Sequence, residues 1–570
     1  MLAAEVIKSS AHRAISRIFF SKIYCHRIIF VSLLWPFLLG TSGRGTIELA
    51  PLFQDHAVLQ RDRPVSIWGW ADPGESVTVS FAGQQEQTIA DSSGAWQTRL
   101  APMAACVAPA SLVVEGTNRI VCSDIVVGDV WLGSGQSNLA WSVGAADNPD
   151  AETEAANWPL IRQIKIDLEV SDKREARVGG TWKVCSPSTV GVSSAVGYYF
   201  ARELHRTLQI PVGLINCSFG GSSIEAWLSP EALAADARFI ALADRWRRTV
   251  AAVDPAKRAA FSEVLDGWQK AVMRAHAEGF GGVAPMRPWP PPGPGHYHTP
   301  SGLFNGMLAP LVPYTLRGFI WYQGEANVAH SEEYKILFPA LIADWRHWFG
   351  DVSLPFYWVQ LPNFEAKDES GKSWALFREA QAATLNVKGT GQAITIDIGN
   401  IQNIHPGNKQ EVGRRLALIA QACTYSLPVI YRGPRPQSIQ REGTGLWITF
   451  DDAAGGLLSR GAVEGFEVAG VDGLFVSAFA TIDSRRVYVY SPQVATPMSV
   501  RYAWANAPQA SLFNRAGLPM EPFRYLNIEA AAVPLSAPPK AQYRRSVSAI
   551  ALDLLVAVGR SAWAGFIFAP

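Results

Sequence analysis

The sequence is poor in cysteine and in net charge, and each shortage excludes a class of protein. Its 570 residues include six cysteines, with no CxxC pair or His/Cys cluster of metal-ligand spacing, so no structural zinc is expected. Charged residues make up 17% of the chain, the formal net charge is +1, and long Lys/Arg clusters are lacking. Neither nucleic acid nor an anionic membrane is therefore expected as a partner.

Long apolar runs are also lacking. Ile28–Leu39 is a run of about a dozen apolar residues between basic and small ones, which suits a signal peptide and is short for a membrane span. A second apolar stretch, Ile550–Phe568, is interrupted by Asp553 and Arg560, so no stable membrane span is expected there. We therefore predict a leader over residues 1–44 and export to the periplasm or the extracellular space.

The chain is rich in hydrophobic residues, at 48%, and it is too long for one core. Short alternating strands with Gly, Pro and Asp turns predict a β-sandwich over 45–125 and a second one over 428–528. Between them, over 126–427, strands and helices alternate, which predicts an α/β domain with a parallel sheet covered on both faces. This domain carries an insertion over 230–300, helical at first and then Pro-rich, and the tail 529–570 is expected to be poorly ordered.

Two cysteines, Cys106 and Cys122, flank one short β-like segment in the first sandwich. They either pair in an oxidising compartment or serve as small buried residues. The sequence predicts no particular oligomeric state.

Ser137 is a candidate nucleophile. It lies in a turn of small and polar residues, Gly133 to Leu139, directly after a predicted strand. Ligands of open parallel sheets bind beyond the carboxyl ends of the strands, so a hydroxyl there is well placed. The alternative is a Ser/Gly turn that only caps the next helix. The Gly-x-Ser-x-Gly elbow of α/β-hydrolases is excluded, because Leu139 stands where its second glycine belongs.

His405 is the candidate base among ten histidines. A strand is predicted over Ala393–Ile398 and a helix soon after Pro406, which puts His405 on a loop at a strand's carboxyl end. Two rivals, His296 and His298, lie beside the Pro-rich segment with no strand to position them.

Two further loops after predicted strands could stabilise an oxyanion. Gly220 and Gly221 follow one buried strand, and glycines let backbone N–H groups approach a substrate closely. Gln323 follows another strand and offers a side-chain amide. Four predicted strand ends thus carry, in chain order, a serine, a Gly-Gly pair, a side-chain amide and a histidine. Packing of a hydrophobic core does not explain this set of polar residues.

The sequence motifs of these loops resemble those of the sialate O-acetylesterase family of the SGNH hydrolases. The similar blocks, with flanking stretches from about residue 48 to 524, are Gly135–Asn138, Gly220–Ser222 with Ile224–Trp227, Gln323–Glu325, and Ile404–Pro406 with Lys409. The resemblance implies a flavodoxin-like, three-layer esterase domain between β-sandwich modules. It also implies a serine esterase that needs no metal or organic cofactor and releases acetate from an acetylated carbohydrate.

The resemblance also assigns roles to residues. Ser137 and His405 would be catalytic, and the N–H groups of Ser137 and Gly221 with the Gln323 side chain would form the oxyanion hole. The side chains of Gln136, Asn138 and Glu325 would bind the substrate.

One departure from the pattern concerns the acid that orients the histidine. Many SGNH enzymes carry Asp three residues before the histidine and several relatives carry it two before, but here these positions are Gln402 and Asn403. Loss of such a carboxylate costs about four orders of magnitude in a well-studied triad. The orienting group is left open between Asp397, Glu325, Asn403 and a backbone carbonyl. Two alternative functions follow: a carbohydrate-binding protein with weakened or lost catalysis, and an esterase for acetylated xylan or another glycan.

Overall fold

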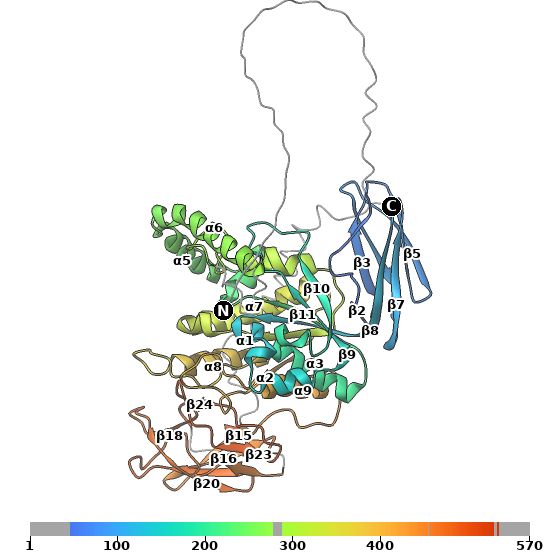
Figure 1. Cartoon of the computed structure of the whole chain (residues 1–570). Helices are drawn as coiled ribbons and strands as arrows, with labels where there is room; N and C mark the ends of the chain where they lie inside the picture. The colour runs from blue at the N-terminus through green and yellow to red at the C-terminus, as the bar shows by residue number, and fades with distance from the viewer. Residues whose placement is uncertain (1–45, 278–287, 454, 529–532, 535–570) are drawn as a thin grey trace, which may run out of the picture. The chain divides into compact units, whose positions relative to one another are not determined.

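The computed structural model describes residues 46–277, 288–453, 455–528 and 533–534 (Figure 1). The predicted leader and nearly all of the predicted tail lie outside these residues. Within the described part of the chain, no helix is both long enough and apolar enough to cross a membrane.

The first part of the chain is built mostly from antiparallel strands. They are β1 (Glu48–Leu49), β2 (Val58–Gln60), β3 (Val65–Trp70), β4 (Ser76–Phe81), β5 (Gln84–Ile89), β6 (Ala95–Leu100) and β7 (Cys106–Glu115). β1, β3 and β6 form one small sheet. β5 pairs with β4, β4 with β7 and β7 with the next strand, β8, whereas β2 pairs with β8 in parallel. Cys106 lies opposite Val127 and Cys122 opposite Leu112, and both thiols are free, so the two cysteines do not pair.

A single long strand, β8 (Arg119–Gly135), joins this part to the central sheet. Its first half pairs with β7 antiparallel, and its second half pairs in parallel with its two neighbours, β11 (Val212–Ser218) and β12 (Gly318–Tyr322). The other strands are β9 (Trp158–Ile166), β10 (Gly180–Cys185), β13 (Phe356–Val359) and β14 (Thr390–Ala393), in the order β10-β9-β11-β8-β12-β13-β14. All of these pairs are parallel except β10 with β9.

Helices cover both faces of the central sheet. They are α3 (Ala195–Leu208), α7 (Ser331–Trp348), α8 (Ser373–Ala383) and α9 (Lys409–Cys423). On β13, Phe356 and Trp358 pack against Phe338 of α7, whereas Tyr357 between them bonds to Thr424 at the end of α9. Successive residues of a strand point to opposite faces, so α7 and α9 lie on opposite sides.

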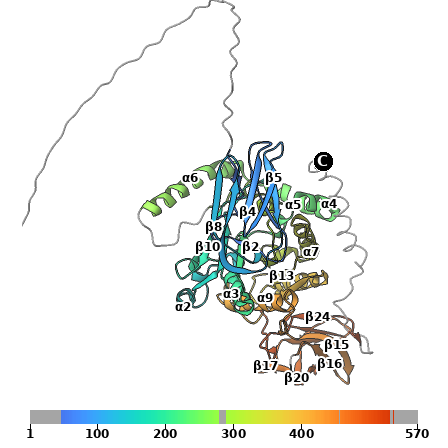
Figure 2. The ribbon, with the colours of Figure 1, turned by 90° about the vertical axis from the view of Figure 1, so that its right-hand side faces the viewer.

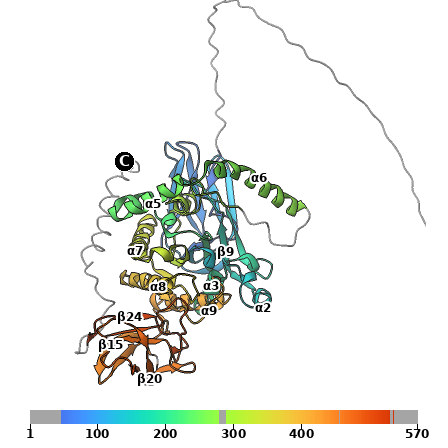
Figure 3. The same cartoon turned by 90° about the vertical axis from the view of Figure 1, so that its left-hand side faces the viewer.

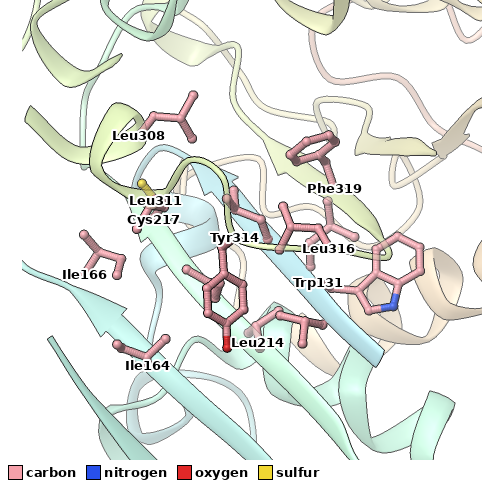
Figure 4. Packing of buried hydrophobic residues seen from close by; sticks show 14 of the residues in the cluster. Trp131, Ile164, Ile166, Leu214, Cys217, Leu308, Leu311, Tyr314, Leu316 and Phe319 are labelled. Atoms are coloured by element: carbon pink, nitrogen blue, oxygen red, sulfur yellow. The ribbon is translucent and has the colours of Figure 1, made fainter. Parts of the chain in front are cut away.

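One hydrophobic core joins the β1–β7 strands to the central sheet. Figure 4 shows part of it around Leu214 of β11 and Trp131 of β8, with Tyr314 close by. The insertion contributes α4 (Pro230–Ala235), α5 (Ile240–Ala251) and α6 (Pro255–Ala277). α6 extends away from the sheet, as Figures 2 and 3 show.

A second core belongs to the C-terminal strands. They are β15 (Arg435–Glu442), β16 (Gly445–Asp451), β17 (Leu457–Ser459), β18 (Phe466–Ala469), β19 (Val476–Ser477), β20 (Phe479–Asp483), β21 (Arg486–Tyr490), β22 (Ser499–Tyr502), β23 (Leu512–Asn514), β24 (Phe523–Tyr525) and β25 (Val533–Pro534). The strand expected over Ala393–Ile398 was placed wrongly, since β14 ends at Ala393. The reason is that Ile394 and Ile396 pack into this second core instead of continuing the sheet.

Candidate active site

The nucleophile candidate follows closely on the carboxyl end of β8. Gly135 closes the strand with φ of 130°, and a Cβ there would lie 2.1 Å from the carbonyl oxygen of Tyr322, so only glycine fits. Two residues later Ser137 begins the short helix α1 (Ser137–Ala140). The strand end and this turn together leave the Ser137 side chain partly exposed at the edge of the sheet.

His405 reaches Ser137 from the loop that precedes α9. Its Nε2 lies 2.8 Å from the Ser137 Oγ, within hydrogen-bond distance, although 268 positions separate the two residues. The structure therefore brings together the two residues that the sequence singled out for catalysis. Neither rival histidine takes this place: His298 Nε2 instead contacts the Gly221 carbonyl oxygen at 2.7 Å, and His296 is buried against Tyr297.

None of the three predicted acids or amides bonds to the His405 ring among the described residues. Asp397 is held by two hydrogen bonds from Arg415, of 2.6 and 2.8 Å. Asn403 accepts at 2.9 Å from the backbone N–H of His405, not from its ring. Glu325 accepts from the Asn138 side chain. Ser137 and His405 thus form a dyad, and no acidic residue in the described part of the chain hydrogen-bonds to the imidazole as a third member.

The imidazole is held by an indole instead. Trp141 stacks on His405, with ring centroids 4.7 Å apart and the planes 16° from parallel. The indole is fixed in turn by a 2.7 Å hydrogen bond from its Nε1 to the Ala145 carbonyl oxygen. Burial and the nearby charge of Lys409 lower the pKa of His405, so its ring is neutral and able to accept a proton near pH 7.

Two backbone N–H groups beside the nucleophile are free. Gly221 has φ of 75°, and a Cβ on the adjacent Gly220 would lie 3.8 Å from the Cβ of Ser137. Among the described residues, neither the Ser137 nor the Gly221 N–H has a backbone or side-chain acceptor. Both groups remain available for an oxyanion, as predicted from the sequence.

The Gln323 side chain is not available for that role. Its amide donates to the Ser222 carbonyl oxygen at 3.1 Å and to Asn327 Oδ1 at 2.7 Å, and its oxygen accepts from Tyr334. A carboxamide has two N–H groups, and both are used inside the protein. The prediction of Gln323 as an oxyanion donor is therefore wrong in this structure: the amide is fully buried and ties loops together.

One predicted substrate-binding residue also points inward. Asn138 is fully buried, and its amide donates to Glu325 and, at 3.0 Å, to the Ile404 carbonyl oxygen. The Asn138 oxygen accepts from the ammonium of Lys409, which is buried as well. The predicted contact of Asn138 with substrate is wrong for this reason, since its polar atoms serve an internal network, whereas Glu325 is half-buried and its contact with substrate stays a prediction.

The charged groups of this network are shielded from solvent, fully for Lys409 and partly for Glu325, which is half-buried. Burial lowers the pKa of the Lys409 ammonium to about 7, against the opposite effect of the nearby Glu325 and Asp147. Burial also raises the pKa of the Glu325 carboxyl, whose Oε2 has no hydrogen-bond partner. Because Asn138 adjoins the nucleophile and Ile404 adjoins His405, the network joins the two halves of the dyad.

Gln136 is the predicted substrate-binding residue that keeps a free donor. Its Oε1 accepts from the backbone N–H groups of Gly324 and Ala326 at 3.3 and 3.4 Å. Its Nε2 has no hydrogen-bond partner among the described residues. Gln136 thus remains a candidate for substrate contact.

Comparison with known proteins places this geometry in a family. The model of the family described as carbohydrate esterase, sialic acid-specific acetylesterase, matches residues 127–258 and 288–421. The crystal structure of a carbohydrate acetylesterase from Xanthomonas citri is 37% identical, with a TM-score of 0.71, and the match covers 84% of this chain and 99% of that one.

The chain belongs to the sialate O-acetylesterase family. Curated members of this family match along most of their length. The mouse sialate O-acetylesterase is 28% identical over 536 residues, which is 84% of this chain and 94% of the mouse protein. The human sialate O-acetylesterase is 28% identical over 452 residues, which is 72% of this chain and 78% of the human protein. Membership in the sialate O-acetylesterase family makes the chain an ester hydrolase.

Two residues that hold the dyad of this sialate O-acetylesterase family member, Trp141 and Lys409, were assigned no role from the sequence. Trp141 lies four residues after Ser137, but nothing in its local pattern predicts a stack on a histidine from a distant loop. Lys409 belongs to the motif that contains His405. The helical pattern after Pro406 could have predicted that Lys409 lies in the first turn of α9 and is buried there. Both residues act on the dyad without touching the Ser137 hydroxyl.

Proposed function

We propose that the chain hydrolyses O-acetyl esters of carbohydrates, with Ser137 as nucleophile and His405 as general base. The observation that carries the catalytic assignment is the 2.8 Å contact between His405 Nε2 and Ser137 Oγ. A base must lie within hydrogen-bond reach of the proton that it removes, and this contact meets that requirement. The family membership supports the acetyl ester and the carbohydrate.

Acetyl transfer to the enzyme is the first half of the reaction. Ser137 Oγ attacks the acetyl carbonyl carbon while its proton passes to His405 Nε2. The N–H groups of Ser137 and Gly221 donate to the oxyanion that develops on the carbonyl oxygen. The C–O bond to the sugar then breaks, His405 returns the proton to the sugar oxygen, and the acetyl group stays on Ser137.

Hydrolysis of the acetyl-enzyme is the second half. His405 Nε2 takes a proton from a water molecule, whose oxygen attacks the acetyl carbon on Ser137. The same two N–H groups stabilise the second oxyanion. When the intermediate breaks down, the proton on His405 returns to Ser137 Oγ and acetate leaves.

The imidazolium that forms in both halves receives no hydrogen bond from a carboxylate of the residues that the structure describes. Trp141 fixes the plane of the ring, and the bond from the His405 N–H to Asn403 fixes its backbone, so the dyad is positioned but less well stabilised than a triad. The same observation favours a second candidate function, a carbohydrate-binding protein with weak turnover. A kcat/KM for a sugar ester within the range of ordinary enzymes, about 10⁴ M⁻¹s⁻¹ or more, and lost in Ser137→Ala, excludes that second candidate.

The pH profile tests the dyad. Since the base must be neutral and its pKa is lowered, kcat/KM should rise with pH and reach half its maximum below about 6.5. Asn403→Asp adds a carboxylate that stabilises the imidazolium. We expect it to move the midpoint to higher pH and to raise kcat by about tenfold or more, a part of what a triad acid contributes.

The matched control is Asn400→Asp, which adds the same charge to the same loop. Asn400 bonds only to the backbone N–H groups of Gln402 and Asn403. Its variant should shift the midpoint less and leave kcat within about twofold. Equal midpoints and equal kcat for the two variants would contradict the dyad.

The substrate within the class of acetylated carbohydrates is proposed from the relatives. The matched mouse and human proteins are sialate O-acetylesterases, so an O-acetylated sialic acid is the first candidate, and acetylated xylan or another glycan is the alternative. Acetate release measured on both classes of substrate separates them. We expect acetate from at least one sugar ester in the wild type and none above background in Ser137→Ala, and a wild type that releases none would refute the proposed function.

The finer architecture and the location in the cell belong to the same proposal. Residues 126–427 are assigned to a flavodoxin-like SGNH esterase domain, between β-sandwich modules over 45–125 and 428–528. The parallel order of β9, β11, β8, β12, β13 and β14 supports this assignment. Residues 1–44 are assigned to a signal peptide that directs export.

A further inference from the structure

A group of aromatic side chains lies beside the dyad and takes no part in the proposed mechanism. Trp289 and Tyr297, from the Pro-rich end of the insertion, pack on Phe219 with ring centroids 4.9 and 5.8 Å away. The two rings also meet each other at 5.3 Å, close to perpendicular at 65°. We call Phe219, Trp289 and Tyr297 the aromatic shelf.

The shelf is continuous with the oxyanion loop. Phe219 directly precedes Gly220 and Gly221, and a Cβ on Gly221 would lie 3.3 Å from a ring carbon of Tyr297. The glycine next to it approaches Ser137, whose Cβ is 3.8 Å from the position of a Cβ on Gly220. The Gly220–Gly221 backbone therefore contacts Ser137 on one side and Tyr297 on the other. We infer that the alcohol part of an ester bound at Ser137 reaches the rings.

The loop that carries the shelf is held in place. His298 Nε2 lies 2.7 Å from the Gly221 carbonyl oxygen, and the His296 ring stacks on Tyr297 with centroids 4.4 Å apart. His296 is buried and its backbone N–H donates to the Gly293 carbonyl oxygen. The position of the shelf relative to Gly221 is thus fixed by the protein before any ligand binds.

The outer rings keep surface and polar atoms free. Phe219 is buried, whereas Trp289 and Tyr297 are only half-buried. Among the described residues, the Trp289 Nε1 and the Tyr297 hydroxyl have no hydrogen-bond partner. A ring that only braced the loop would need neither exposed surface nor free polar atoms. A binding site, by contrast, combines aromatic surface with a few polar groups that fix the orientation of the ligand.

We propose that the aromatic shelf is the sugar subsite, where Trp289 and Tyr297 bind the pyranose ring that carries the acetyl ester. The apolar C–H face of the ring lies on the aromatic surface, and its hydroxyls meet the free N–H and O–H groups. The proposal rests on the proposed function, since the shelf selects the alcohol part of the ester and Ser137 cleaves it. A sugar, not an acyl chain, is the occupant, because flat aromatic surface with free donors matches a hydroxylated ring.

The test compares two esters of different alcohols. Trp289→Ala and Tyr297→Ala are assayed on an acetylated pyranoside, using both acetylated xylo-oligosaccharide and O-acetyl sialic acid, and on 2-hydroxyethyl acetate, which has no ring. For the pyranoside that the wild type cleaves faster, KM should rise about three- to tenfold in each variant, the loss expected for one aromatic contact. With 2-hydroxyethyl acetate, kcat/KM should stay within about twofold.

Further variants separate binding from folding. Trp289→Phe and Tyr297→Phe keep the rings and should keep KM within about threefold. Trp158→Ala, which removes a half-buried indole packed on His205 away from this loop, should leave both substrates unaffected. In a Ser137→Ala background, titration calorimetry with the same pyranoside should show the same three- to tenfold weakening when Trp289→Ala or Tyr297→Ala is added.

The outcomes distinguish the shelf from the proposed function. Equal losses on the pyranoside and on 2-hydroxyethyl acetate, or no loss on either, would overturn the sugar subsite while acetate release by the wild type still upholds the esterase. A wild type that cleaves 2-hydroxyethyl acetate but binds no pyranoside would overturn the subsite as well. Failure of the wild type to release acetate from any ester overturns the proposed function itself.

Discussion

Replacing His405 by alanine is expected to lower kcat/KM for an acetylated sugar by about 10⁴- to 10⁶-fold. The variant loses the group that lies 2.8 Å from Ser137 Oγ, and the structure provides no second base there among the described residues. The free N–H groups of Ser137 and Gly221 would still support a small residual rate. Initial rates of acetate release, measured at a pH above the midpoint of the wild-type profile, give the ratio.

His56→Ala is the matched control for this prediction. His56 pairs with Asp124 at 2.6 Å in the first part of the chain, far in sequence from the dyad, and its side chain is exposed. Its variant should keep kcat/KM within about twofold. A loss smaller than about 100-fold in His405→Ala would mean that another group accepts the proton, and the assignment of His405 as base would be wrong.

The second large effect is on stability and concerns Asn138. Replacing it with leucine keeps the volume and removes the amide, so Lys409 loses its acceptor, Glu325 loses its donor, and the Ile404 carbonyl loses a hydrogen bond. Buried charges left without partners cost about 3–5 kcal/mol in free energy of unfolding. We expect a fall in Tm of about 5 °C and a lower kcat, because the network joins the loops of both catalytic residues.

Two comparisons sharpen the Asn138→Leu measurement. Asn386→Leu removes an exposed amide that donates only to the Ala383 carbonyl oxygen, and it should cost less than about 0.5 kcal/mol. Adding Lys409→Met and Glu325→Gln to Asn138→Leu removes the stranded charges and should recover at least about half of the loss. If urea unfolding gives Asn138→Leu the same small cost as Asn386→Leu, the buried network does not hold the site.

The sequence predicted the location of the site because topology constrains it. In a parallel sheet the carboxyl ends of all strands meet at one edge, so loops after several strands converge whatever their separation in the chain. Strand ends, together with the motifs of the resembled family, therefore suggested Ser137 and His405 as a pair. The mixed α/β class with several sheets was predicted on the same grounds and agrees with the structure. β8, however, crosses the boundary predicted between residues 125 and 126 and serves two sheets.

The direction of side chains could not be predicted from the same pattern. Gln323 and Asn138 occupy loops at the site, yet each turns inward to a partner from a distant segment, Ser222 for Gln323 and Lys409 for Asn138. A loop motif fixes which residues are near a strand end, but the rotamer depends on which donor or acceptor the rest of the fold brings close. The stack of Trp141 on His405 was missed for the same reason.

The end of β14 at Ala393, five residues before the predicted end of the strand, could not be predicted for a similar reason. The apolar residues after Ala393 fit the pattern of a strand, but Ile394 and Ile396 belong to a different core from that of the central sheet. Periodicity shows that a side chain is buried and does not show in which core it is buried. The consequence is functional, since the early end of β14 lets the chain turn toward the loop that carries His405.

Labelling of Ser137 by a fluorophosphonate tests the central claim most directly. The reagent reacts with a serine that a neighbouring base activates, and peptide mapping by mass spectrometry identifies the modified residue. The account predicts one adduct, on Ser137, which is absent in Ser137→Ala and forms far more slowly in His405→Ala. An adduct on the buried Ser134 or on any other residue, or acetate release by a protein that shows no adduct, would contradict it.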